Sequence, residues 1–324
     1  MKSVKQTLWI ALLAAAALPY SLGAQVIPGI NTKAGGMVVP KGKAVMGIKY
    51  VYLKKNHMFD GTHEVTNLQH LDATAYMTLL ALRYGIADNM DIRVVMPVKH
   101  IDATAQLMPG VGVAIDNTGL SDIVVMGKYR FYNQNGLQLA VGAGLKLPTG
   151  STNKGFKKAP PFHLTKGDRT PLPTQPGTDK TEYKMEAGLS KVFSPDFRLD
   201  MHAMYTYRPK AKNDYDFGNE FLFDAGVVKA LNDKFNVGLE YNFQYNSATD
   251  MGSDIPPNKA LRKIFPFKAF SGSAGYLTPE IEFLPFGKPK LFVGAGMSFL
   301  IHKNLKEYQP LEKRRFMLRV GYMF

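Results

Sequence analysis

Apolar and polar residues alternate along five stretches of the chain, so that every second residue is apolar. The clearest stretch is the last one, residues 314–324, where one face carries Phe316, Leu318, Val320, Tyr322 and Phe324. Successive side chains of a β-strand point to opposite faces, so this period of two predicts strands. The other four stretches cover residues 137–147, 197–207, 235–245 and 291–301. Each is about as long as a tilted strand that crosses a bilayer.

Seven weaker runs fill the gaps between these five stretches and bring the prediction to twelve strands. They cover residues 44–53, 72–86, 90–102, 120–132, 181–193, 219–231 and 269–284. Pro279 makes the last of these runs the least regular, because a proline cannot donate a ladder hydrogen bond.

The connections between the predicted strands alternate between short and long without exception. The short ones are rich in turn residues, as at 133–136 and 194–196. The long ones cover residues 54–71, 103–119, 148–180, 209–218, 247–268 and 303–312. Short periplasmic turns and longer external loops are typical of outer-membrane barrels. The sequence therefore predicts an all-β fold, an antiparallel transmembrane β-barrel of twelve strands over residues 42–324, with both ends in the periplasm.

The N-terminus has the pattern of an export signal. Lys2 and Lys5 precede an apolar run at residues 8–18, and small residues precede Gln25. This run is too short for a transmembrane helix. We therefore expect a signal peptide at residues 1–24 and a periplasmic N-terminal segment at residues 25–41. The chain has no Cys, which excludes disulfides, thiolate metal sites and a lipidated cysteine.

Aromatic residues gather near both ends of the predicted strands, as expected for side chains at the two membrane interfaces. The predicted periplasmic ends carry Tyr84, Tyr129, Phe131, Phe193, Phe197, Phe235, Phe283, Tyr322 and Phe324. The predicted outer ends carry Tyr50, Tyr52, Tyr183, Tyr205, Tyr207, Phe221, Phe223, Phe243, Tyr245, Phe299 and Phe316.

The net charge of +14 falls to +12 once Lys2 and Lys5 are removed with the signal. Such a basic balance often indicates nucleic acid, but no helical reading element is present, and we expect no nucleic-acid partner. The expected partners are outer-membrane lipid, the phosphates of lipopolysaccharide and small solutes. The terminal Phe324 is expected to bring the chain to the barrel-assembly machinery.

Several stretches resemble a known family. Residues 119–123 and 127–131 read GLSDI and GKYRF, and residues 142–150 read GAGLKLPTG. With residues 39–42 and 82–86, they resemble the segments of a Gram-negative outer-membrane channel family named after the meta-cleavage pathway of phenol degradation. Ser121 stands where that pattern more often has Gly. The resemblance implies a barrel and a role in solute uptake, with aromatic catabolic substrates as one class, and it establishes no substrate.

Alternation also assigns charged residues to the inward face. Twelve bases point inward: Lys49, Arg83, Arg93, Lys99, Lys128, Arg130, Lys146, Lys184, Arg198, Arg208, Arg315 and Arg319. Eight acids share this face: Asp91, Asp122, Glu182, Glu186, Asp200, Asp224, Glu240 and Glu282. The candidate pore-lining residues are Lys49, Arg83, Arg93, Lys128, Arg130, Lys146, Arg198, Arg208, Asp224, Glu240, Arg315 and Arg319.

The excess of bases favours anions in a narrow pore. The sequence leaves two functions open. The barrel is either a channel for the passive uptake of small solutes, aromatic or anionic, or a non-conducting structural or ligand-capturing surface barrel whose lumen its own charges fill.

The loop at residues 148–180 holds six prolines and six basic residues. It folds inward as a constriction, lies outside on lipopolysaccharide, or is simply a mobile surface loop, and the sequence leaves these three alternatives open. Six of the seven histidines fall near the outer end, with spacings that match no metal-ligand motif, so no metal or other cofactor is expected. Ser190 and His202 point inward without an obvious orienting acid, so we expect no catalytic residues and no enzyme.

Overall fold

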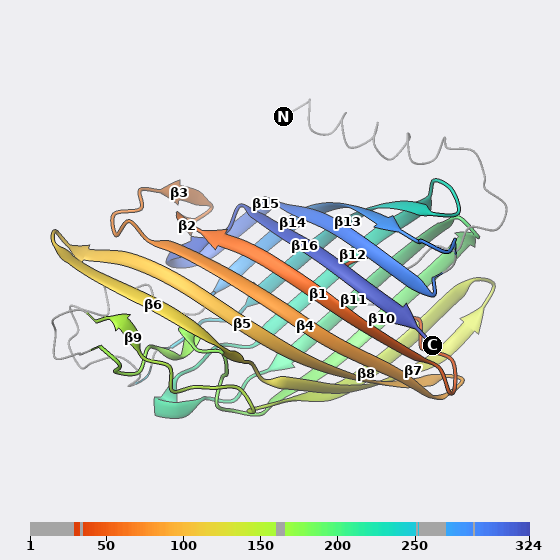
Figure 1. The fold of residues 1–324 in the computed structure, drawn as a ribbon, viewed down its shortest axis with the longest axis horizontal. Coiled ribbons are helices and arrows are strands. Elements are labelled where there is room, and N and C mark those ends of the chain that lie inside the picture. Colours follow the sequence, from red (N-terminus) through yellow and green to blue (C-terminus); the bar gives the residue numbers. More distant parts are fainter. Residues whose placement is uncertain (1–28, 33–34, 160–165, 251, 253–269, 288) are drawn as a thin grey trace.

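Twelve long strands form a closed antiparallel barrel in which β1 pairs with β16, as the sequence predicts (Figure 1). The computed structural model describes residues 29–32, 35–159, 166–250, 252, 270–287 and 289–324. The wall strands are β1 (Ala44–Lys55), β4 (Asp72–Ala87), β5 (Met90–Met108), β7 (Ile123–Gln134), β8 (Leu137–Leu147), β10 (Glu182–Ser194), β11 (Phe197–Tyr207), β12 (Glu220–Ala230), β13 (Phe235–Asn246), β14 (Gly272–Phe283), β15 (Leu291–Leu311) and β16 (Arg314–Met323). In the described chain, no helix has the length and apolarity needed to cross a membrane.

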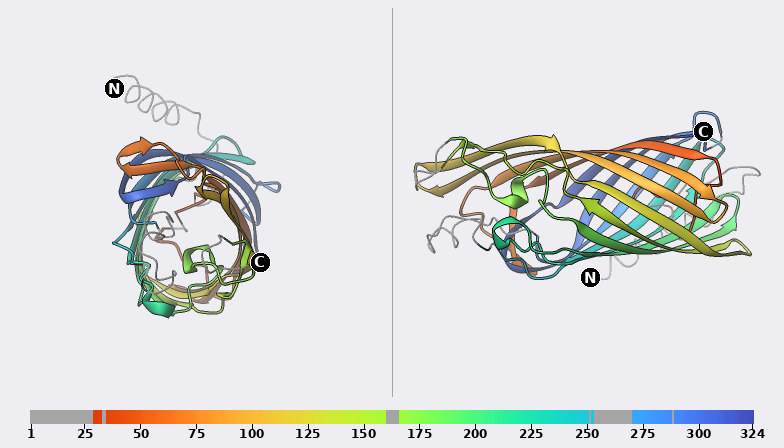
Figure 2. Two further views of the ribbon diagram at one scale, coloured as in Figure 1. Left: turned by 90° about the vertical axis from the view of Figure 1, so that its left-hand side faces the viewer. Right: turned by 90° about the horizontal axis from the view of Figure 1, so that it is seen from below.

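Within the described residues, four short or peripheral strands and two 3₁₀ helices lie in the connections that the sequence assigns to long loops. They are β2 (His57–Gly61), β3 (His63–Val65), β6 (Val111–Leu120), β9 (Phe156–Lys158), η1 (Leu172–Thr174) and η2 (Lys212–Asp214). β6 pairs with the outer half of β5 and extends the wall beyond the barrel (Figure 2). The prediction of a loop at residues 103–119 is therefore wrong. Val113 and Ile115 already alternate with polar or small residues there, as a strand requires.

The long connections gather at one end of the barrel and the short turns at the other (Figure 1). The two ends of the wall meet at the short-turn end, where the Ala44 amide donates to the Phe324 carbonyl at 2.9 Å. This arrangement agrees with the predicted even number of strands and with the predicted alternation of connections.

The barrel is apolar outside and polar inside. Ile48, Val141 and Val320 are each about half exposed on the outer face. Charged side chains such as Glu186 and Arg198 are buried inside. A water-soluble protein has the opposite distribution, whereas a barrel in a bilayer turns its apolar face to lipid.

Aromatic side chains pair across neighbouring strands at both rims. At the short-turn end the rings of Phe235 and Phe283 lie 5.1 Å apart. At the long-loop end the rings of Tyr183 and Tyr207 lie 6.2 Å apart. Both positions match the aromatic belts that the sequence predicts at the two membrane interfaces.

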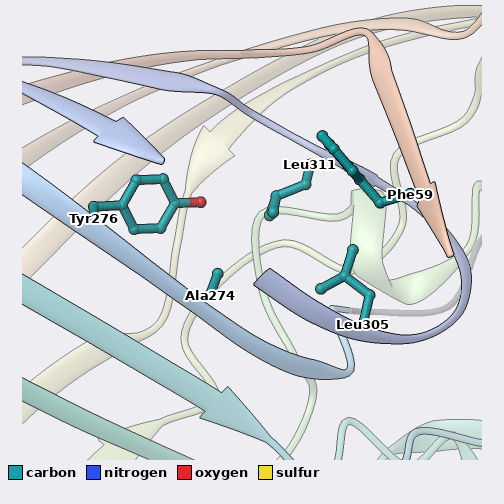
Figure 3. Close-up of a cluster of buried hydrophobic side chains, with 5 residues drawn as sticks. All are labelled: Phe59, Ala274, Tyr276, Leu305 and Leu311. Atoms are coloured by element: carbon teal, nitrogen blue, oxygen red, sulfur yellow. The ribbon is translucent and has the colours of Figure 1, made fainter. Parts of the chain in front are cut away.

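The first long connection is packed onto the outer ends of β14 and β15. Phe59 of β2 lies with Leu305 and Leu311 of β15 and with Ala274 and Tyr276 of β14 in a cluster of buried side chains (Figure 3). Burying an aromatic and two leucines stabilises this connection by several kcal/mol on the usual scale of roughly 25 cal/mol per Å². The part of the outer rim formed by β2, β14 and β15 is therefore a packed structure.

Candidate functional site: the barrel lumen

The described residues of the N-terminal segment, 29–32 and 35–39, lie inside the barrel, where inward carboxylates bind their backbone amides. The Ile30 amide donates to Glu280 at 2.7 Å, and the amides of Asn31 and Thr32 donate to Glu240 at 3.0 and 3.1 Å. Inward bases bind the carbonyls of the same stretch. Lys49 donates to the Ile30 carbonyl at 3.1 Å and Arg319 donates to that of Gly29 at 2.9 Å.

Residues 35–39 contact a different part of the wall. Lys128 of β7 donates to the Gly35 carbonyl at 2.9 Å, and the Gly36 amide donates to Ser190 of β10 at 3.0 Å. The Val39 amide donates to Asp91 of β5 at 2.8 Å. The segment thus contacts β13 and β14 with one part and β5, β7 and β10 with the next.

The expected periplasmic placement of residues 25–41 is therefore corrected for residues 29–32 and 35–39. A chain without regular structure needs partners for its backbone N–H and C=O groups wherever water is displaced. Carboxylates and ammonium or guanidinium groups of the wall supply those partners here. Alternation along β14 places Glu280 on the same face as Glu282, but the irregularity at Pro279 obscured it, and it was not among the predicted inward acids.

All twelve predicted site residues carry contacts with other inward groups. Eight of them form ion pairs with inward carboxylates. On β4 to β8, Arg83 pairs with Asp91, both Arg93 and Lys128 pair with Glu186, and Lys146 pairs with Asp122 and Glu182. On the later strands, Arg198 pairs with Asp200, Arg208 with Glu182 and Glu220, Arg315 with Glu312, and Arg319 with Glu282. Lys49 and Glu240 bind the N-terminal segment, Arg130 donates to Gln138, and Asp224 accepts from Asn242. The wall is more nearly neutral than the predicted excess of bases implies, because Glu220, Glu280 and Glu312 add three acids to its inner surface, whereas Lys55 adds one base.

Glycines opposite long charged side chains make this dense packing possible. Gly142 of β8 lies opposite Glu186 of β10, and a Cβ at position 142 would stand 2.8 Å from the Glu186 Cγ. Glu186 therefore lies flat across β8 and reaches Lys128 of β7 at 3.6 Å and Arg93 of β5 at 2.9 Å. The same pairing of glycine with a charged side chain recurs at Gly226–Glu240, Gly238–Glu280 and Gly294–Arg319. The inward glycines thus make room for wall charges rather than simply widening the lumen.

A cavity of about 920 Å³ remains between the N-terminal segment and the wall. Seven of the predicted residues line it: Lys49, Arg83, Arg93, Arg130, Asp224, Arg315 and Arg319. The other five, Lys128, Lys146, Arg198, Arg208 and Glu240, lie outside its lining. Arg198, for example, is bound by both oxygens of Asp200 at 2.5 and 2.6 Å and is almost fully buried.

The inner wall is divided into an apolar and a polar sector. The inward positions of β1, β4 and β5 carry mostly small or apolar residues, among them Leu79, Ala81 and Val95, which line the cavity. The inward positions of β10 to β14 carry mostly acids, amides and bases. Lys49, Arg83 and Arg93 border the apolar sector, so an apolar solute displaces the least water from charged groups where it lies against Leu79, Ala81 and Val95.

The described part of loop 148–180 folds over the outer mouth of the lumen, and Asp122 holds it there. One oxygen of Asp122 accepts from the Gly150 amide at 2.9 Å, and the other accepts from the amide and the hydroxyl of Thr178 at 2.9 and 2.6 Å. The Thr149 hydroxyl accepts from the Ile123 amide at 3.0 Å. The GLSD and KLPTG stretches of the sequence therefore meet at this carboxylate. The inward alternative for this loop is the one that the structure supports.

Replacing Asp122 with alanine should release the loop. The variant loses three hydrogen bonds to a buried carboxylate, and such bonds contribute about 1.5–3 kcal/mol each. We expect trypsin to cleave after Lys154 or Arg169 at least about tenfold faster than in the wild type, since about 1.4 kcal/mol changes an opening equilibrium tenfold. Asp116→Ala is the matched control, because Asp116 pairs with Lys157 of the same loop at the exposed surface. Equal cleavage rates in the two variants would contradict this role of Asp122.

The buried polar groups near Ser190 do not form a hydrolytic site. The Ser190 hydroxyl donates to Asp200 at 2.5 Å, whereas His202 lies between Glu186 and Asp224 at 3.1 and 3.5 Å. Ser190 is bound by a carboxylate and His202 contacts two others, so the serine–histidine pair of a hydrolytic site is not formed. Within the described ranges, no three His, Asp or Glu side chains are grouped as metal ligands would be.

The fold is similar to that of a solved outer-membrane channel, and the sequence matches a family model. An outer-membrane channel from Pseudomonas putida F1 superposes with a TM-score of 0.66 at 12% identity, over 93% of this chain and 100% of that one. The toluene transporter TodX of the same species matches at a TM-score of 0.46 and 8% identity, over 95% and 96% of the two chains. No curated protein sequence matches. The family model described as "putative MetA-pathway of phenol degradation" matches residues 59–299, so the chain belongs to this family of bacterial outer-membrane proteins.

Proposed function

We propose that the protein is a channel for the passive passage of small solutes across the outer membrane, with small apolar or aromatic solutes favoured over sugars and inorganic ions. The apolar sector of the lumen is the observation that carries this proposal. It runs along β1, β4 and β5 and includes Leu79, Ala81 and Val95 beside the 920 Å³ cavity. An apolar solute gains about 25 cal/mol for each Å² of surface that it buries against such a wall. The name of the family supports the same class of solute.

The near balance of inward charges argues against a strong preference for anions. Each inward arginine that pairs with a carboxylate contributes little net potential to a passing ion. We therefore replace the mild anion preference expected from the sequence with a preference set by the apolar sector. Contact of the basic loops with lipopolysaccharide and recognition of Phe324 by the assembly machinery remain predictions.

Single-channel recording in planar bilayers tests the proposal. Wild-type protein should show a small unitary conductance in KCl, because the N-terminal segment narrows the lumen. Phenol added at millimolar concentration should reduce the open-channel current, since a solute in the apolar sector obstructs the ions, whereas glycerol should not. Protein that inserts fully but never conducts would contradict the channel and favour the ligand-capturing barrel.

A further inference from the structure

A second cavity, of about 290 Å³, lies at the outer mouth of the lumen. It shares no lining residue with the cavity of about 920 Å³. We call it the outer-mouth pocket. Leu53 of β1, Ala75 of β4 and Ile101 of β5 stand side by side in its wall, because strand pairing places them in one row. Pro173 and Thr174 of η1 close it on the loop side. Loop 148–180, held by Asp122, is thus part of its wall.

Small side chains create the space of this pocket. Ala73, Ala75 and Ala103 occupy inward positions where longer side chains would fill the rim. A dry cavity of about 150 Å³ is enough for benzene, so about 290 Å³ admits a substituted ring or a short alkyl chain. Its walls match the mostly apolar lining, with a few placed polar groups, that small-molecule sites share.

Two lysines give the pocket its charged groups. Lys99 lies in the row next to Leu53, Ala75 and Ile101, and its ammonium donates to the Gln175 carbonyl at 3.2 Å. No described carboxylate lies within 4 Å of that ammonium. Lys55, on the other side of the row, is 3.6 Å from Glu312, which Arg315 also binds. The pocket therefore offers a positive charge whose neighbours do not fully neutralise it.

We propose that the outer-mouth pocket is a capture site for an amphiphilic monocarboxylate. The apolar body lies against Leu53, Ala75 and Ile101, and the carboxylate accepts hydrogen bonds from Lys99. A neutral apolar molecule uses only the walls, and a small inorganic anion uses only the lysine, so the site selects ligands that carry both parts. This proposal rests on the proposed channel only for the passage of the ligand after it has bound. Binding at the outer-mouth pocket can be measured without transport.

Isothermal titration of the mature protein in phosphatidylcholine nanodiscs tests the proposal, with empty nanodiscs as the blank. The probes are 4-phenylbutyrate and octanoate, which distinguish an aromatic from an alkyl body, and the neutral 4-phenylbutanol. At least one of the two acids should bind. Lys99→Met should weaken its binding by about tenfold to a hundredfold, the usual effect of losing a hydrogen bond to a charged group. Binding of the alcohol should be weaker in the wild type and unchanged by Lys99→Met.

Three further variants separate this explanation from a structural effect. Lys99→Arg should keep the affinity for the acid, and Lys157→Met, which removes an exposed lysine of the loop outside the pocket, should leave it unchanged. Ala75→Phe should abolish binding of acid and alcohol alike, because the ring fills the pocket. Heat-modifiable mobility on gels confirms that each variant is a folded barrel.

The outcomes for capture and for conduction are distinct. Absence of binding by both acids, or equal affinity in the wild type and Lys99→Met, would overturn the capture site even if the wild type conducts. Binding that follows the pattern above, in a protein that never conducts, would support the capture site and overturn the proposed channel.

Discussion

Deletion of residues 29–38 should raise the unitary conductance severalfold. This stretch contacts β13 and β14 through Ile30 and Asn31, and β7 and β10 through Gly35 and Gly36, so it stands across the lumen. The conductance of a narrow pore rises with its open cross-section, and water replaces the deleted chain beside the freed carboxylates. Single-channel recording of the deletion variant beside the wild type provides the measurement. Residues 1–28, which include the predicted signal peptide, stay in place, so the variant leaves the predicted export signal unaltered.

A point variant should reproduce part of this effect. Glu240→Ala removes the acceptor that holds the amides of Asn31 and Thr32, so the segment should leave its position for part of the time and the channel should show added, larger conductance levels. Asp224→Ala is the matched control, because this inward carboxylate contacts His202 and Asn242 instead of the segment's backbone. An unchanged conductance in the deletion variant would show that another element limits the flow of ions.

The wall of the barrel was predictable because its signal is local. Each strand crosses the membrane with one face to lipid and one to the lumen. Apolar and polar or small residues therefore alternate along a strand such as Leu137–Leu147, and this alternation can be recognised from the strand alone. The one irregular run has a physical cause. Pro279 pairs in register with Leu239 of β13, but the pairing of β14 with β15 is interrupted between Leu277 and Glu280. A proline lacks the N–H that this second ladder needs.

The position of residues 29–32 and 35–41 and the pairing of the inward charges were not predictable from the sequence, because both depend on residues that are far apart in the chain. Residues 29–41 show no periodicity, and the Asn31 amide finds its acceptor, Glu240, 209 residues along the chain. Arg93 and Glu186 stand on strands separated by β7 and β8, so alternation places both inside but cannot pair them. The alternation of side chains along β5 likewise predicts that Lys99 points into the lumen. It does not predict the space that Ala73, Ala75 and Ala103 leave beside this lysine. Such contacts depend on the closure of the barrel.

An arginine on the lipid face should destabilise the barrel far more than an arginine on the lumen face. Val141 lies in the middle of β8, paired with Tyr129 and Ala187, and is about half exposed on the outer surface. An arginine at such a depth costs about 2–4 kcal/mol near the bilayer midplane. Val141→Arg should therefore lower the free energy of unfolding in lipid vesicles by about that amount, measured by urea titration with tyrosine fluorescence.

Leu222→Arg is the matched control, since it also replaces an apolar residue of a central wall strand. Leu222 faces the lumen cavity on β12, between the inward acids Glu220 and Asp224. A guanidinium at this position lies beside two carboxylates and water, so its charge is not exposed to hydrocarbon. We expect this variant to unfold within about 1 kcal/mol of the wild type, the range of an ordinary substitution away from a tightly packed site. If both arginines lowered the free energy of unfolding equally, the division of the wall into a lipid face and a lumen face would be wrong. The apolar sector would then no longer support the proposed function.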